Sequence, residues 1–172
     1  MTLRIVATGG TFDKHYDEIA GELAFGASHL DEIVRRARLT LSVTVEILPL
    51  QDSLDMSDAD RARVLASCRA AEETSLVVIH GTDTMCETAH QLGTAPELAS
   101  QGKRIVLTGA MVPYEVVDSD ALFNLGFACA AAQVLAPGIY VAMNGQVFAW
   151  DAVRKNRAAG RFEATETTAV RE

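Results

Sequence analysis

The stretch Leu76-Val-Val-Ile-His-Gly-Thr-Asp-Thr84 is the strongest fold signal in the chain. Its first four residues are apolar and mostly β-branched, which predicts a strand buried on both faces of a parallel sheet. The segment from Met85 to Leu92 then has a helical pattern, with Thr84 and Glu87 in the spacing of a capping box. Two hydroxyls and a carboxylate should therefore lie on a turn at the carboxyl end of a buried strand, where open α/β sheets bind ligands. Taken alone, these polar residues are explained equally well as helix caps.

The composition and charge of the chain exclude several functional classes. The chain has 172 residues, of which 49% are hydrophobic and 22% charged, which suits one globular domain. A net charge of −8 argues against nucleic acid or an anionic membrane as partner. No apolar stretch approaches the ~20 residues of a membrane span, and no leader pattern precedes the first apolar run. The three cysteines have no paired spacing and are expected to be free thiols. We expect a cytoplasmic protein.

The rest of the chain repeats a strand, a polar or glycine-rich loop and a helix. Ser28 with Asp31 and Ser57 with Asp60 have capping spacing at two helix starts, and Pro49 is expected to end a strand. The last helix is apolar almost all round, so it should be buried in the domain or in a subunit interface, which predicts a homo-oligomer. The expected strands are 3–7, 43–48, 76–79, 104–108 and 139–143; the expected helices are 28–38, from 57, 85–98 and 119–135; 12–25 is expected to form a hairpin, 146–155 a β-extension and 156–172 an exposed tail.

This order predicts an α/β fold, a three-layer Rossmann/flavodoxin-like domain with a mostly parallel sheet and an N-terminal β-hairpin lid. Residues 1–172 are expected to form one domain. Because the carboxyl ends of parallel strands meet at one edge, the loops after five strands should bring some of their residues together there. These residues are Thr11, Ser53, Thr82, Asp83, Met111 and Asn144.

Several common chemistries lack their signatures. The chain has neither a G-x-x-x-x-G-K-[ST] nor a G-x-G-x-x-G after its first strand, and it has no G-x-S-x-G elbow. Its four histidines show no H-E-x-x-H spacing, so we expect no metal site. His80, at a strand end, is expected to be packed and hydrogen-bonded, and His90 to lie on the surface.

Hydroxyl chemistry without a serine triad remains. A threonine is a poor nucleophile unless a neighbouring group takes its proton, and a desolvated lysine can do so. The chain has only Lys14, Lys103 and Lys155. Lys103 precedes a strand and therefore faces the opposite edge of the sheet. The residues alone favour neither Lys14 nor Lys155.

Several motifs together resemble the L-asparaginase/glutaminase family. They are Ala7-Thr-Gly-Gly-Thr-Phe12, His80-Gly-Thr-Asp-Thr-Met85 with Glu87-Thr-Ala, Leu107-Thr-Gly-Ala-Met111, Phe123-Asn-Leu, and Met143-Asn-Gly followed by Lys155-Asn. Their order and spacing match over nearly the whole chain. Usual members are roughly twice as long and have a second, C-terminal domain, so the chain is most similar to short-chain bacterial L-asparaginases.

The resemblance implies hydrolysis of L-asparagine through an acyl-enzyme, without a cofactor. Thr11 matches the nucleophile, and Thr82, Asp83 and Lys155 match a second catalytic group. Asp83 would also bind the substrate's α-amino group, and Ser53 its α-carboxylate. Tyr16 is the only tyrosine available as the catalytic lid tyrosine. The implied substrate-binding residues are Gly10, Asp52, Ser53, Gly81, Thr82, Asp83 and Ala110.

Two departures from the family pattern affect this reading. Leu54 stands where many members have a polar residue, which implies that one substrate contact is missing. The acidic group that a second domain usually supplies has no counterpart, which predicts either weaker substrate affinity or an altered assembly that supplies a different group. Asn144 and Asp120 are expected to be structural. The alternatives are a glutamine-preferring amidase, an ammonia-producing subunit of an amidotransferase, and a non-catalytic amino-acid-binding module.

Overall fold

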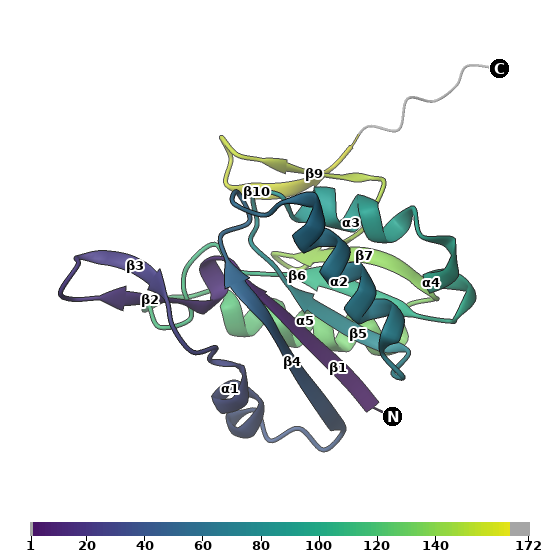
Figure 1. The fold of residues 1–172 in the computed structure, drawn as a ribbon, viewed down its shortest axis with the longest axis horizontal. Helices are drawn as coiled ribbons and strands as arrows, with labels where there is room; N and C mark the ends of the chain where they lie inside the picture. The colour runs from purple at the N-terminus through teal and green to yellow at the C-terminus, as the bar shows by residue number, and fades with distance from the viewer. Residues whose placement is uncertain (1, 166–172) are drawn as a thin grey trace.

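The computed structural model describes residues 2–165, which form a three-layer α/β domain and confirm the predicted fold class (Figure 1). The central sheet has six strands in the order β4-β1-β5-β6-β7-β8, and only β8 is antiparallel to its neighbour. The strands are β1 (Thr2–Gly9), β4 (Ser42–Gln51), β5 (Ser75–Ile79), β6 (Arg104–Thr108), β7 (Gly138–Met143) and β8 (Gln146–Ala149), and the helices are α1 (Leu30–Arg36), α2 (Asp58–Ala70), α3 (Met85–Gly93), α4 (Pro96–Ser100) and α5 (Ala121–Val134).

The strand order places the ligand-binding edge. Without β8, the sheet runs second, first, third, fourth, fifth strand in chain order, which is the flavodoxin-like arrangement. The connections change direction between β1 and β5, which pair in register from Leu3 with Ser75 to Ala7 with Ile79. The loops after β1 and β5 therefore flank the topological switch point, where such folds bind their ligands.

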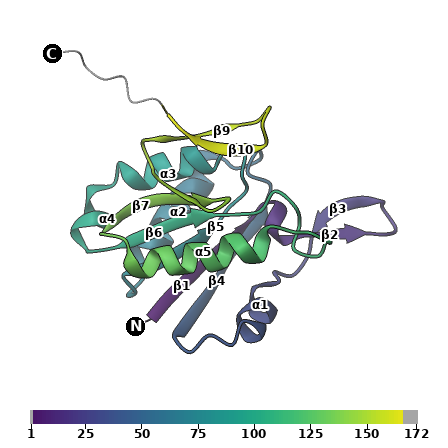
Figure 2. The same ribbon diagram turned by 180° about the vertical axis from the view of Figure 1, so that it is seen from behind.

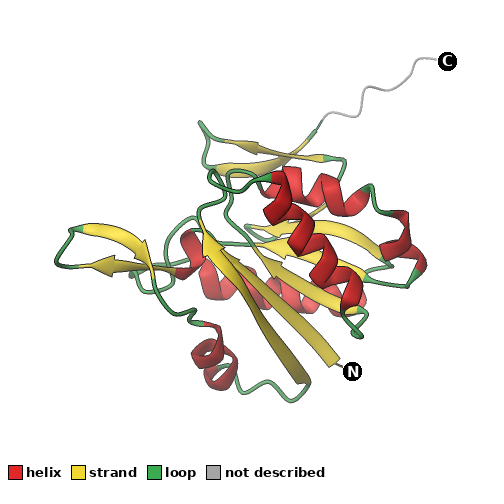
Figure 3. Cartoon of the chain, in the orientation of Figure 1, coloured by secondary structure: helices red, strands yellow, loops and turns green. Residues whose placement is uncertain are grey.

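Helices cover both faces of the sheet, as Figures 1 and 3 show from one side and Figure 2 from behind. On one face α2 and α3 pack against alternate strand residues such as Leu76 and Val78. On the other face α5 and α1 cover the residues between them, such as Val77 and Ile79. All five residues of β5 are buried, as expected for a central parallel strand. None of the helices between residues 2 and 165 is long and apolar enough to cross a membrane.

The predicted elements are confirmed, with corrections at several of their ends. Strand β4 continues through Pro49 to Gln51, because β4 is an edge strand that pairs only with β1, and a proline is tolerated there. His29 and not Ser28 is the N-cap of α1, although the Ser28 hydroxyl, which donates to Asp13 at 2.9 Å, still accepts from the amide of Leu30 at 3.3 Å. The helix predicted over 85–98 is two helices, separated by Thr94 and Ala95.

The apolar helix predicted over 119–135 is α5, and part of its surface is exposed. Although seven residues of α5 are buried, the side chains of Leu122, Phe123 and Val134 are 54%, 60% and 82% exposed. Residues 2–165 therefore leave part of the surface of this helix uncovered.

Two hairpins flank the sheet. The predicted hairpin after the first strand forms from β2 (Lys14–Asp17) and β3 (Glu22–Phe25), and it projects away from the sheet (Figure 1). A second hairpin forms from β9 (Val153–Asn156) and β10 (Arg161–Ala164). The prediction of an exposed tail is wrong for Phe162, which is buried against the core beside Val153. The part of the predicted tail from 166 to 172 lies outside the described residues.

Candidate active site

The turn after β1 lies against the turn after β5. Gly10 has φ 74° and ψ −173°, a conformation that is essentially restricted to glycine. A Cβ on Gly10 would lie 2.3 Å from the Cα of Gly81, and the amide of Gly10 donates to the carbonyl of Gln51 at 3.0 Å. Thr11 follows at the start of a 3₁₀ turn, Thr11–Asp13. The two threonine-bearing turns thus meet backbone to backbone at the switch point.

The loop after β4 completes this contact. A Cβ on Gly81 would lie 2.6 Å from both Cβ and Oγ of Ser53. Ser53 is buried, and its hydroxyl has no hydrogen-bond partner among residues 2–165. A buried hydroxyl without a partner is costly unless a ligand or water satisfies it. Ser53 is therefore suited to contact a ligand held between the three loops.

Thr84 joins the same loops by a contact that the sequence did not predict. Its hydroxyl donates to the carbonyl of Ser53 at 2.8 Å and does not cap α3. Glu87, the other half of the predicted capping box, accepts instead from Arg61 at 2.7 Å. The predicted capping box is therefore wrong, because the Thr84 hydroxyl donates to a carbonyl of another loop and does not accept from the amide of Glu87.

Lys155 connects the β9–β10 hairpin to the turn after β5. Its Nζ donates to Thr82 Oγ1 at 2.7 Å and to Asp83 Oδ1 at 3.0 Å. Thr82 is buried, and the Lys155 side chain is only 13% exposed. Arg157 Nε lies 3.4 Å from the same oxygen of Asp83. Arg157 lies in the turn that follows β9, and the sequence analysis did not single it out.

The other two lysines have different partners. Lys14 Nζ donates to Asp52 Oδ2 at 2.7 Å, and this contact lowers the pKa of the Asp52 carboxyl. Lys103 lies at the opposite edge, as predicted, where its Nζ hydrogen-bonds the carbonyls of Ala71 and Glu73. Within the described residues, Lys155 is therefore the one lysine that hydrogen-bonds a threonine hydroxyl.

His80 holds the turn after β5 in place. Burial lowers its pKa to about 4, so the ring is neutral at pH 7. Nδ1 lies 2.8 Å from the carbonyl of Gly81 and therefore carries the proton, while Nε2 lies 2.8 Å from Thr88 Oγ1, whose hydroxyl can donate to it. The prediction of a packed, hydrogen-bonded histidine is confirmed.

The loop after β6 packs beside this turn. A Cβ on Gly109 would lie 2.3 Å from the carbonyl of His80, and Ala110 is buried. The Asp120 carboxylate accepts from the amides of Met111 and Val112 at 2.9 and 3.0 Å. This supports the structural role expected for Asp120.

A second position behind this loop was not singled out by sequence reasoning. Asn124 donates to Asp120 at 2.8 Å and to the carbonyl of Gly109 at 3.0 Å, and its Oδ1 accepts from the amide of Asn144 at 3.1 Å. The signal available was its place in Phe123-Asn-Leu. Asn124 thus joins the loops after β6 and β7.

Tyr16 lies apart from this group. It is on β2, where it pairs with Leu23, and its side chain is 63% exposed. Among the described residues no hydrogen bond connects it to Thr11, Thr82 or Lys155. A cavity of about 530 Å³ is also remote from the site, since it is lined by α1, α5 and apolar residues of β1.

Comparison with known proteins gives a consistent family. The family described as "Asparaginase, N-terminal" matches residues 2–171. An L-asparaginase of Thermococcus kodakarensis is 30% identical over 163 residues, covering 93% of this chain and 49% of its own length. A glutamyl-tRNA(Gln) amidotransferase subunit of Pyrococcus abyssi is 31% identical over 147 residues, covering 83% of this chain and 33% of its own.

Comparison with solved structures gives the same family. The solved structure of the thermostable L-asparaginase from Thermococcus kodakarensis superposes with a TM-score of 0.83 and 28% identity, over 95% of this chain and 51% of that one. This chain thus spans about half the length, or less, of the relatives it matches.

Proposed function

Since this chain belongs to the asparaginase family, we propose that it hydrolyses the side-chain amide of L-asparagine to L-aspartate and ammonia. The observation that carries the proposal is the contact of Lys155 Nζ with both Thr82 Oγ1 and Asp83 Oδ1, in a turn that touches the Gly10–Thr11 turn. A lysine, an aspartate and two threonines at one switch point match the needs of acyl transfer through a hydroxyl.

In the proposed mechanism, Thr11 Oγ1 attacks the amide carbonyl carbon and the tetrahedral intermediate expels ammonia. Water then attacks the ester formed with Thr11 and releases aspartate. Lys155 Nζ and Thr82 Oγ1 are 2.7 Å apart, close enough to pass a proton between them. With Lys155 as the neutral amine, Thr82 Oγ1 takes the proton of the attacking Thr11 hydroxyl while its own proton moves to Lys155, and the pair then returns a proton to the leaving nitrogen, so that ammonia departs. The same pair takes the proton of the attacking water and returns it to Thr11 Oγ1. Backbone amides of the glycine turns would stabilise the oxyanion, each worth about 3 kcal/mol in related chemistry.

Substrate recognition is assigned to the groups around this turn. Asp83, which is 32% exposed at the side chain, would accept from the α-ammonium group. Ser53 would donate its unpartnered hydroxyl to the α-carboxylate. Gly10, Gly81 and Ala110 supply backbone at the same place, and Asp52 holds Lys14 beside it. A catalytic role for Tyr16 would require the β2–β3 hairpin to move toward the site.

The test is ammonia release from L-asparagine and L-glutamine by the purified chain, compared with its Thr11→Ala and Thr82→Ala variants. We expect hydrolysis of asparagine that falls by orders of magnitude in each variant, while the exposed-site control Thr40→Ala keeps the rate. Unchanged rates in both variants would contradict the proposal. Absence of turnover with retained aspartate binding would instead favour a binding module.

A second candidate is an ammonia-producing subunit that prefers glutamine. It is favoured by the similarity to the glutamyl-tRNA(Gln) amidotransferase subunit of Pyrococcus abyssi. A larger kcat/KM for glutamine than for asparagine in the same assay would support it.

We also propose that the chain assembles as a homo-oligomer, a dimer or tetramer. The support is the exposed apolar surface of α5 at Leu122, Phe123 and Val134. Burying such side chains contributes about 1.5–3 kcal/mol each when the burial is complete.

A further inference from the structure

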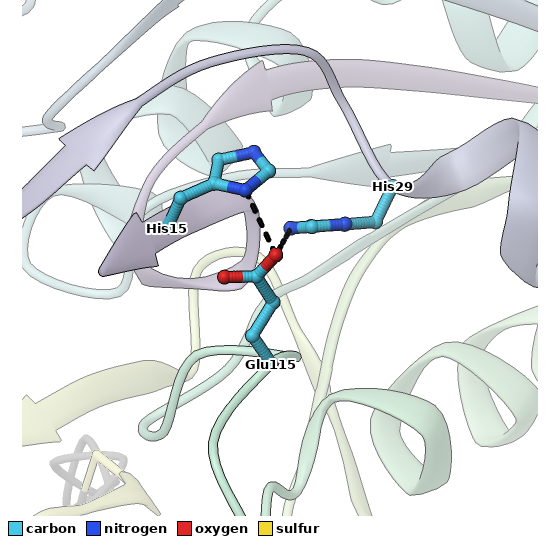
Figure 4. A group of neighbouring side chains, drawn as sticks. All are labelled: His15, His29 and Glu115. Atoms are coloured by element: carbon cyan, nitrogen blue, oxygen red, sulfur yellow. Dashed lines mark hydrogen bonds and ion pairs between the residues drawn. The ribbon is translucent and has the colours of Figure 1, made fainter. Parts of the chain in front are cut away.

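Two imidazoles and a carboxylate that the proposed mechanism does not use meet where the β2–β3 hairpin joins the domain. His15 comes from β2, His29 from the N-cap of α1, and Glu115 from the loop after β6. Their candidate ligand atoms all lie within 4.8 Å of one another. Figure 4 shows both rings turned toward the same carboxylate oxygen. No motif marks this cluster in the sequence, because its three residues belong to separate segments of the chain.

The hydrogen bonds of His15 show which ring nitrogen carries the proton and which one faces Glu115 with a lone pair. Nε2 lies 2.8 Å from the carbonyl of Ala27, which can only accept, so Nε2 carries a proton. In the neutral ring Nδ1 then has a lone pair, yet it lies 2.9 Å from Glu115 Oε1. A lone pair and a carboxylate oxygen at this distance repel each other unless a cation lies between them. The Ala27 carbonyl also fixes the ring, as groups behind metal-bound histidines do.

His29 provides the second, independent observation. Its Nε2 is buried and has no hydrogen-bond partner among residues 2–165, although it lies 3.7 Å from the same oxygen, Glu115 Oε1. A proton on His15 would satisfy the shorter contact but would leave this nitrogen without a partner. An ion held by all three groups would satisfy both.

The separations suit a small metal ion. A tetrahedral zinc ion with bonds of about 2.0–2.1 Å holds neighbouring ligand atoms about 3.3 Å apart. The two distances to Glu115 Oε1, 2.9 and 3.7 Å, lie on either side of this value. Two histidines and one carboxylate are also a common zinc ligand set. We propose that His15, His29 and Glu115 bind a divalent transition-metal ion of the zinc type.

Such an ion would fasten the hairpin to the domain. His15 is the second residue of β2 and follows Thr11 closely in the chain, while the other two ligands belong to the body of the domain. Gly26 leaves room for the His15 ring, since a Cβ there would lie 3.1 Å from His15 Cδ2. The Glu115 side chain is 42% exposed, so an ion can enter and water can take a fourth position.

The experiment titrates Zn²⁺ and Co²⁺ into the chain, freed of metal by a chelator and carrying no polyhistidine tag. Calorimetry should give one Zn²⁺ per chain, and His15→Ala and Glu115→Gln should each weaken its affinity by at least about tenfold. Zn²⁺ should raise the Tm of the wild type more than that of either variant. The Co²⁺ complex should show a spectrum of nitrogen and oxygen ligands without thiolate charge-transfer bands.

Two exposed positions serve as matched controls. Glu22→Gln lies on the same hairpin, and His90→Ala removes a surface histidine; both should bind Zn²⁺ like the wild type. Circular dichroism of Glu115→Gln, an isosteric change, confirms that loss of binding is not loss of fold. The proposal is overturned by absence of saturable binding, by equal affinity in His15→Ala and Glu115→Gln to that of the wild type, or by thiolate bands that point to Cys86.

Discussion

The contact between the turns after β1 and β5 can be tested by adding single methyl groups. In Gly10→Ala the new Cβ would lie 2.3 Å from Gly81 Cα and 2.5 Å from Gly81 N, and both obstacles are backbone atoms that cannot rotate away. The change also forces alanine into a backbone conformation that costs about 1–3 kcal/mol. Overpacking of this kind adds about 1–3 kcal/mol. We therefore expect Gly10→Ala to lose about 2–6 kcal/mol of unfolding free energy.

Two other glycines separate strain from contact. Gly21 has φ 72° with nothing within 4 Å of the position of a Cβ, so Gly21→Ala should lose only the backbone strain of about 1–2 kcal/mol. Gly126 lies in α5 with the same open surroundings, so Gly126→Ala should gain about 0.5–1 kcal/mol. The ranking of the three variants therefore depends on the contact and not on glycine replacement as such.

The assay is urea unfolding followed by circular dichroism, with the three variants compared at one protein concentration. Equal slopes of the unfolding free energy against urea concentration would show that the variants expose the same surface on unfolding. Gly10→Ala should also reduce asparagine hydrolysis, because the shift separates Thr11 from the turn that carries Thr82. The reasoning is refuted if Gly10→Ala costs no more stability than Gly21→Ala.

Three further predictions concern pH, the lysine and assembly. Because burial lowers the pKa of His80 from 6.5 to about 4, the unfolded chain binds more protons than the folded chain between these pH values. The free energy of unfolding should therefore fall as the pH falls through this window, by roughly 3 kcal/mol in all. Urea unfolding of the wild type and of His80→Gln at several pH values checks this, and an equal dependence of stability on pH in the two proteins would count against it. Lys155→Met should lower kcat by at least about 100-fold. Arg154→Met changes a neighbouring side chain of the same strand that is 64% exposed, and it should leave kcat unchanged. An equal loss of kcat in both variants would show that the effect is structural. Sedimentation at micromolar concentration should show an oligomer that Phe123→Lys weakens, and a wild-type chain that sediments only as a monomer would exclude this assembly.

The fold was predictable because the strand patterns are local. Leu76 to Ile79 is apolar at every position, which only a buried strand explains well, and the polar turn after it marks the edge of the sheet. The end of β4 was not predictable in the same way. Whether Pro49 ends a strand depends on whether that strand lies at the edge, which is a property of the whole sheet.

The site was predictable in part. Family resemblance assigned Lys155, but the residues alone could not choose between it and Lys14, because the choice depends on which acidic side chain each lysine reaches in the fold. At Thr84 the local sequence pattern predicted a contact that does not form. Its spacing to Glu87 fits a cap, yet the carbonyl of Ser53 is the acceptor. The cluster of His15, His29 and Glu115 has no sequence signal at all, since three separate segments meet there.

The most direct test of the threonine mechanism is to locate the acyl group. Intact-protein and peptide mass spectrometry of the wild-type chain, quenched with acid during turnover of L-asparagine, should find one aspartyl group on the peptide that contains Thr11, and none in the Thr11→Ala variant. An aspartyl group on another residue, or full hydrolytic activity in Thr11→Ala, would contradict the mechanism.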